Sequence, residues 1–187
     1  MKDKLILVLG ILVILSAVNT GIAWNWETLK CPEGNCSISM PPVTDKDTNE
    51  VTHDSDSYNQ YMYFSTMPDF LMSLCIYDLT HWENENISIP DGQAYLYRFL
   101  KPQKDRLKKP QTLYIKDIVL DNTYPGLEFK LSGKKFLGKE FVTCRLYLVR
   151  KKIYYMVYVR DKGSSAHKND HVYTTRFFDS FRLLENE

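Results

Sequence analysis

Four runs of strand-forming residues follow one another in the second half of this 187-residue chain, and they restrict its fold more than any other feature. They cover residues 112–120, 126–131, 141–149 and 153–159, and each is rich in β-branched, aromatic or other apolar side chains. The turn Arg150-Lys151-Lys152 separates the last two runs. Because connections this short join only antiparallel neighbours, the four runs predict an antiparallel meander.

The rest of the chain adds strands and two helices. Residues 24–40 predict a strand or hairpin, and residues 58–66 and 70–79 predict strands, whereas the polar, acidic stretch 43–57 predicts a loop or irregular edge. A helix is expected from residue 89, with an apolar face formed by Tyr95, Leu96, Phe99 and Leu100. Residues 171–180 suit a terminal helix, whose apolar side is Val172, Phe177 and Phe178, and a short strand or tail follows it.

The N-terminus has the pattern of a secretory signal peptide, residues 1–23. Lys2 and Lys4 precede an apolar run over 5–18, and small residues end at Ala23, so cleavage is expected before Trp24. An uncleaved membrane anchor is the alternative, although the run is shorter than the roughly 20 residues of a bilayer span. The sequence therefore predicts an exported protein, periplasmic or secreted, with one domain over residues 24–187. Its 44% apolar content is enough for a packed core.

All four cysteines lie in the predicted mature chain and are disulfide candidates in an oxidising compartment. Cys31 and Cys36 flank a turn signal at residues 33–35, which favours a local bridge between them. Cys75 and Cys144 lie in strand-like runs. They could pair across a sheet, or they could equally be buried free thiols.

Several motifs, in order along the chain, resemble one family. Residues 35–41 (NCSISMP) resemble an opening strand that ends in proline, and residues 124–129 (YPGLEF) resemble a "PG-x-E" turn between central strands. Residues 144–149 and 152–156 resemble the paired strands that follow, and residues 176–183 (RFFDSFRL) resemble an "RFxxSF" ending. Together they are similar to the PsbP/Mog/DcrB-like group, and more closely to its exported bacterial members.

This resemblance implies an α+β fold, a central antiparallel sheet with helices on both faces (an α/β/α sandwich). It implies little chemistry. PsbP is a lumenal accessory subunit of photosystem II and the Mog branch binds a nuclear GTPase, but no residue motif here carries either role over, and a shared fold does not establish a shared function.

One cluster has the spacing of metal ligands: His167 and His171 are four residues apart, with Asp170 between them. A solvated loop with a capped helix start is the simpler interpretation. No nucleophile-elbow, Walker, dinucleotide-binding or zinc-protease motif is present, so no catalytic residue and no cofactor are predicted.

Charge is balanced overall, with 24 basic and 23 acidic residues, which argues against a nucleic-acid binder. Residues 24–97, however, hold 2 basic and 12 acidic residues, and residues 98–187 hold 20 basic and 10 acidic residues. The densest basic positions form a candidate basic patch: Lys101, Lys104, Arg106, Lys108, Lys109, Lys134, Lys135, Lys139, Arg150, Lys151 and Lys152. If the halves interleave, these charges are neutralised instead.

The leading hypothesis is an exported, non-enzymatic accessory or binding domain that engages a protein or envelope partner. One alternative is association with an anionic surface, a membrane or a polymer, through the candidate basic patch. The other is a small extracytoplasmic metalloprotein or hydrolase that uses His167, Asp170 and His171. The sequence indicates no oligomeric state.

Overall fold

The computed structural model describes residues 25–53, 56–79, 87–105, 108–135, 138–161 and 170–184. The predicted signal peptide lies outside these residues. So does His167, the first of the three metal-ligand candidates. None of the described helices is long and apolar enough to cross a membrane.

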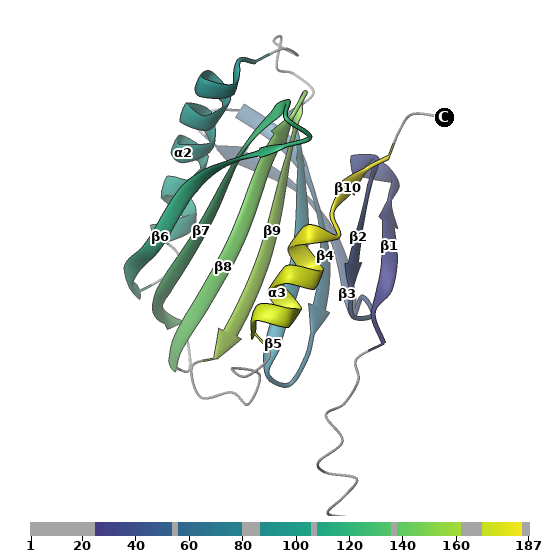
Figure 1. Cartoon of the computed structure of the whole chain (residues 1–187), viewed down its shortest axis with the longest axis vertical. Coiled ribbons are helices and arrows are strands. Elements are labelled where there is room, and N and C mark those ends of the chain that lie inside the picture. Colours follow the sequence, from purple (N-terminus) through teal and green to yellow (C-terminus); the bar gives the residue numbers. More distant parts are fainter. Residues whose placement is uncertain are drawn as a thin grey trace, which may run out of the picture.

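The centre of the molecule is a seven-stranded antiparallel sheet (Figure 1). Its strands, in spatial order, are β3 (Asp45–His53), β4 (Asp56–Thr66), β5 (Phe70–Asp78), β9 (Lys152–Asp161), β8 (Gly138–Val149), β7 (Tyr124–Lys135) and β6 (Lys108–Leu120). The predicted meander is confirmed, because β6 to β9 are consecutive in sequence and adjacent in space. A second sheet of three strands contains β1 (Glu27–Cys31), β2 (Cys36–Met40) and β10 (Arg182–Leu183), with the 3-10 turn η1 (Pro32–Gly34) joining the first two.

Each face of the main sheet carries one helix. The front face, toward the viewer in Figure 1, holds α3 (Asp170–Asp179) together with the three-stranded sheet, and the back face holds α2 (Ile89–Asp105). The α+β class and the antiparallel central sheet agree with the prediction. The α/β/α description needs correction, because a small sheet, and not helices alone, covers much of the front face.

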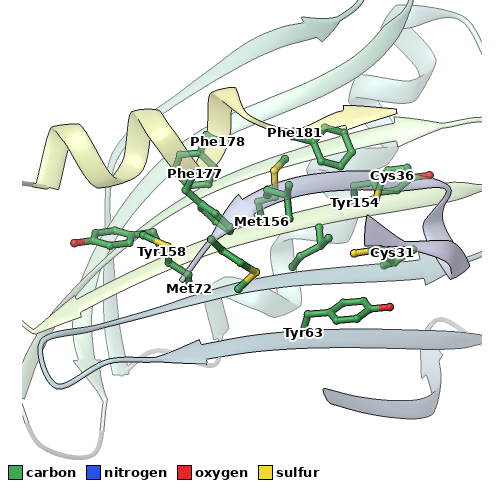
Figure 2. Close-up of a cluster of buried hydrophobic side chains, with 14 of the residues drawn as sticks. Cys31, Cys36, Tyr63, Met72, Tyr154, Met156, Tyr158, Phe177, Phe178 and Phe181 are labelled. Atoms are coloured by element: carbon green, nitrogen blue, oxygen red, sulfur yellow. The ribbon is translucent and has the colours of Figure 1, made fainter. Parts of the chain in front are cut away.

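Alternation along the central strands separates two hydrophobic cores. On β9, Tyr154, Met156 and Tyr158 point to the front core, while Ile153 and Tyr155 belong to the back core. Phe177, Phe178 and Phe181 close the front core from α3 and the residues after it (Figure 2). Leu96, Phe99 and Leu100 of α2 close the back core. The predicted face of α2 is confirmed, with Tyr95 partly buried beside these three residues. The predicted face of α3 is confirmed for Phe177 and Phe178 and wrong for Val172, which is 62% exposed because it lies on the side of the helix that faces away from the sheet.

The acidic stretch predicted as a loop is instead the edge strand β3. It pairs with β4 in unbroken register from Asp45 opposite Phe64 to His53 opposite Asp56. Its side chains from Asp45 to Glu50 are all exposed, so the strand lacks the alternation of apolar and polar residues that sequence analysis detects. Charged side chains of this kind also protect a sheet edge from pairing with another chain.

All four cysteines are buried free thiols in the structure. A bridge between Cys75 and Cys144 is ruled out by topology, because β9 lies between β5 and β8. Two strand spacings separate the chains by about 9.6 Å, more than the roughly 7 Å that a disulfide spans between Cα atoms. The alternative of two buried thiols describes this pair.

Cys31 and Cys36 face each other at the closed end of the β1–β2 hairpin (Figure 2). A hydrogen bond with Cys31 and burial raise the pKa of the Cys36 thiol far above its ordinary value. They are not bonded in the structure, and the local disulfide between them stays a prediction.

The segment Tyr124-Pro125-Gly126, which the sequence suggests as a turn, instead begins strand β7, and the turn before it is formed by residues 121–123. Pro125 packs against Gly92 of α2. A Cβ atom added to Gly92 would lie 2.3 Å from Cγ of Pro125, whose ring cannot move aside as a flexible side chain could. Replacing Gly92 by alanine should therefore destabilise the protein by about 1–3 kcal/mol, although alanine is the better helix former. In a Pro125→Ala background, which removes the 2.3 Å contact and keeps the contact with Cβ of residue 125 at 3.1 Å, the same change should cost at least about 1 kcal/mol less. Urea unfolding of the wild type and the three variants measures this difference, and an equal loss in both backgrounds would contradict the contact.

Candidate functional site

A cavity of about 790 Å³ opens at the end of the main sheet where β5 and β8 finish and β9 begins. Five segments that are distant in sequence line it, and they meet only because the strands return to this end of the sheet. Its lining residues are Gly34, Asn35, Asp78, Asp121, Thr123, Tyr124, Val149, Arg150, Lys151, Lys152, Tyr154, Leu183 and Leu184.

Three turns at this end hold residues in the left-handed region of backbone space. Within the described part of the chain, the non-glycine residues with positive φ are Asn35, Asp121, Asn122 and Arg150. Asn and Asp tolerate this conformation, but a long side chain such as that of Arg150, at φ 51°, adopts it only at a cost. Arg150 occupies the two-residue turn between β8 and β9, where Asn or Gly is the usual choice. Backbone strain of this kind often accompanies a functional position.

A partly buried ion pair between β5 and β9 lies in the lining of the cavity. Nζ of Lys152 lies 2.8 Å from Oδ2 of Asp78, and the two residues are directly opposite in the strand register. The other carboxylate oxygen, Oδ1, is buried and has no hydrogen-bond partner among the described residues. Lys152 therefore already has a counter-ion, while Asp78 keeps an acceptor in need of a donor.

Hydrogen bonds tie the walls of the cavity together. The hydroxyl of Tyr154 donates to the carbonyl of Gly34 at 2.5 Å, and Nδ2 of Asn35 donates to the carbonyl of Leu184 at 2.8 Å. Burial raises the pKa of Tyr154 above its ordinary value, so this phenol stays a proton donor at neutral pH. These bonds fix the η1 turn and the end of β10 against the sheet, which makes the cavity a preformed site.

The lining of the cavity is suited to binding. Its described residues combine cationic side chains, carboxylates, a tyrosine ring at Tyr124 and two leucines. Such a lining offers shape and polar contacts to a ligand.

The η1 turn, which supplies one wall, is anchored to the main sheet by Glu33. Its carboxylate lies 2.7 Å from Nζ of Lys46 and also accepts a hydrogen bond from the hydroxyl of Tyr63. The hydrogen bonds from Lys46 and Tyr63 lower the pKa of Glu33 from its ordinary value of 4.5 to about 2.

Because the folded-state pKa of Glu33 is lowered, its contribution to stability is full above pH 4.5 and is lost as the pH falls toward 2. Glu33→Gln should be less stable than the wild type by about 1–2 kcal/mol at pH 7, since charge-assisted hydrogen bonds are lost at a partly exposed site. The difference should shrink steadily between pH 4.5 and pH 2, as followed by chemical unfolding. A difference that is constant with pH would show that the carboxylate charge plays no part.

The candidate basic patch does not form one surface. By register, Lys108 lies opposite Lys134, and Lys134 lies opposite Lys139, where β7 ends and β8 begins. Arg150 and Lys152 follow the far end of β8, roughly 35 Å away at 3.4 Å per residue. The basic residues of the strands and of the β8–β9 turn therefore form two groups at opposite ends of the sheet, and of the described candidates only Arg150, Lys151 and Lys152 line the cavity. Lys101 is exposed on α2, and Arg106 lies outside the described residues.

The described metal-ligand candidates are engaged elsewhere. Asp170 accepts hydrogen bonds from the hydroxyl of Tyr158 at 2.7 Å and from Nε of Arg160 at 2.5 Å, which anchors the start of α3. Nδ1 of His171 lies 2.9 Å from the hydroxyl of Thr175 on the exposed side of the helix. Within the described part, no three His, Cys, Asp or Glu residues converge as a metal site would require.

Comparison with known proteins identifies the fold. No protein-family model matches the sequence, and a search of curated proteins finds no match. The structure aligns with the solution structure of the cyanobacterial PsbP protein CyanoP from Synechocystis sp. PCC 6803, with a TM-score of 0.53 and 14% identity over 88% of this chain and 95% of that chain. PA94 from Pseudomonas aeruginosa, a protein of unknown function, aligns with a TM-score of 0.44 and 11% identity over 80% of this chain and 92% of that chain. The chain thus has a PsbP-like fold, as the sequence motifs suggest.

Proposed function

We propose that this chain is an exported, non-enzymatic binding domain that acts as an accessory to a protein or envelope partner, and that the cavity holds part of that partner. The observation that carries the proposal is the preformed cavity, whose walls come from segments distant in sequence and are fixed by hydrogen bonds. A tyrosine ring, leucines and charges of both signs suit a peptide or a polar headgroup better than a simple ion.

The two alternatives have less support. Association with an anionic surface needs the basic residues on one face, but they are divided between the two ends of β8. A metal-dependent enzyme needs Asp170 as a ligand, but both of its carboxylate oxygens bond to Tyr158 and Arg160.

Site-specific photo-cross-linking in cells tests the cavity. A photoreactive residue at exposed Thr123, on the cavity rim, should give a discrete adduct, and Arg150→Ala in the same chain should reduce its yield at least several-fold. The control carries the photoreactive residue at Val172, which is 62% exposed on α3 and lies outside the cavity. The same adducts from both positions, or none from Thr123, would contradict recognition at the cavity.

Export is tested separately on the chain recovered from the source cells. Its N-terminus should begin at Trp24, and it should fractionate outside the cytoplasm. A chain that starts at Met1 or Lys2 would instead support an uncleaved N-terminus.

A further inference from the structure

The two faces of the central strands are buried to different degrees. On the front face, Met72, Leu74, Met156 and Tyr158 are at most 2% exposed. On the back face of the same strands and of β4, apolar residues remain partly exposed, and they are Met62, Phe64, Leu71, Val157 and Val159. Strands that are apolar on both faces are typical of sheets covered on both sides. In this sheet the back face is incompletely covered.

These five residues form one continuous area, the back-face floor. The strand register places Phe64 opposite Ser73 and Ser73 opposite Val157, while Leu71 lies opposite Val159. All of them therefore point to the back face, on three neighbouring strands. The floor spans three strands, about 14 Å, and about four residues along them, about 13 Å.

The helix α2 stops short of this floor. It packs over β7 and its neighbours β6 and β8, and Phe99 reaches Tyr77 and Tyr155 at ring distances of 4.9 and 6.5 Å. Beyond Tyr155, toward the β4–β5 turn, no described helix lies on the floor. Since an α-helix with its side chains is about 10 Å wide, the three strands of the floor, about 14 Å across, are wide enough to carry one helix.

The rims of the floor carry opposite charges. On the edge strand β3, Asp45 lies opposite Phe64 and Asp47 lies opposite Met62. Both aspartates are therefore on the back face, directly beside the floor. On α2, the flank that holds Tyr95 packs against the back core, and the guanidinium of Arg98 lies 5.7 Å from the ring centre of Tyr95. This flank faces away from β6, because Tyr97, about 200° further round the helix, bonds to Asp117 of β6.

We propose that the back-face floor is a docking surface for an amphipathic helix of a partner protein. The helix would have two to three turns, with basic side chains on the flank beside Asp45 and Asp47 and acidic side chains on the flank beside Arg98. Its apolar side would cover Phe64 and Val157 and complete the layer that α2 begins. This surface is on a different part of the molecule from the cavity, so it goes beyond the proposed function and does not depend on it.

Three synthetic helical peptides with one shared apolar face test the proposal against the purified chain. The first carries lysines on one flank and glutamates on the other, the second lysines on both, and the third glutamates on both. The mixed peptide should bind at least ten-fold more tightly than either uniform peptide, as measured by fluorescence anisotropy. It should shift the amide resonances of the floor strands while leaving those of the cavity turns unchanged.

Two variants complete the test. Asp45→Lys with Asp47→Lys changes only exposed positions, and it should weaken the mixed peptide at least ten-fold and make the glutamate peptide the preferred one. Phe64→Ala should weaken all three peptides alike. Equal binding of the three peptides, or an order that the double variant leaves unchanged, would overturn the proposal. So would a dimer of the chain alone, seen by sedimentation and dissociated by the double variant, because the occupant would then be a second copy.

Discussion

Replacing Glu128 by alanine is expected to lower the free energy of unfolding by about 2–3 kcal/mol, because it removes charge-assisted hydrogen bonds from a buried carboxylate. Glu128 is 8% exposed on β7, where its carboxylate lies 2.5 Å from Nε of Arg145 and 2.9 Å from Nζ of Lys116. Burial alone would raise the pKa of Glu128, but the hydrogen bonds from Lys116 and Arg145 outweigh it and lower the pKa below its ordinary value. The carboxylate is therefore charged when folded, and its removal leaves Asp179 as the remaining carboxylate bound to Arg145.

The reach of this network makes the loss larger than that of one ion pair. Nη1 of Arg145 lies 2.6 Å from Oδ1 of Asp179, and its guanidinium lies 5.3 Å from the ring centre of Phe178, so the network connects the main sheet to α3. Lys116→Ala is the matched control, because its side chain is 57% exposed and the loss should stay below about 1 kcal/mol. Urea unfolding at pH 7 compares the two variants. Equal losses would show that Glu128 behaves as an ordinary surface charge.

The sequence predicts the strands of this fold wherever burial leaves a periodic pattern. Strands β5 and β9 are nearly continuous apolar runs because they lie inside the sheet, and the short turns between β6 and β9 determine their order without knowledge of distant contacts. The edge strand β3 escapes detection, since its exposed polar residues are held by hydrogen bonds to β4 and not by packing. Its existence depends on a neighbour that local sequence does not reveal.

The cavity was beyond local prediction for a different reason. Its walls come from five segments between Gly34 and Leu184, so only the assembled sheet brings them together. One signal was present: Asp78 ends an apolar run, and Lys152 begins another, and they prove to be register partners. An acidic residue at the end of one buried strand and a basic residue at the start of another can be recognised in the sequence as candidates for an ion pair at the end of the sheet.

The division of the candidate basic patch follows from the meander itself. In an antiparallel meander, successive connections lie at opposite ends of the strand between them. Lys134 and Lys139, near the start of β8, and Arg150 and Lys151, after its end, therefore lie at opposite ends of this strand. Charge that is concentrated along the sequence does not translate into charge on one face.

Replacing Phe177 by alanine should cost about 3–5 kcal/mol, as large-to-small changes of buried aromatic residues do. Phe177 is fully buried on α3, its ring centre lies 5.1 Å from that of Phe178, and both fill the front core (Figure 2). Val172→Ala, on the exposed side of the same helix, is the control and should change stability by less than about 0.5 kcal/mol. A loss for Phe177→Ala close to that of Val172→Ala would mean that α3 does not hold the front core closed.

The double variant Phe177→Ala with Glu128→Ala tests whether the two contacts that hold α3 to the main sheet act together or independently. Phe177 holds the helix to the sheet through apolar packing, and Glu128 holds it through Arg145 and Asp179. If either change alone releases the helix, the second change removes contacts that are already lost, and the double loss should fall at least 1 kcal/mol short of the sum of the single losses. Hydrogen exchange would then show the amides of α3 opening in each single variant while the strands of the back core remain protected. A strictly additive loss, with α3 protected in both single variants, would mean that the two contacts stabilise separate regions and that the helix stays docked without either one.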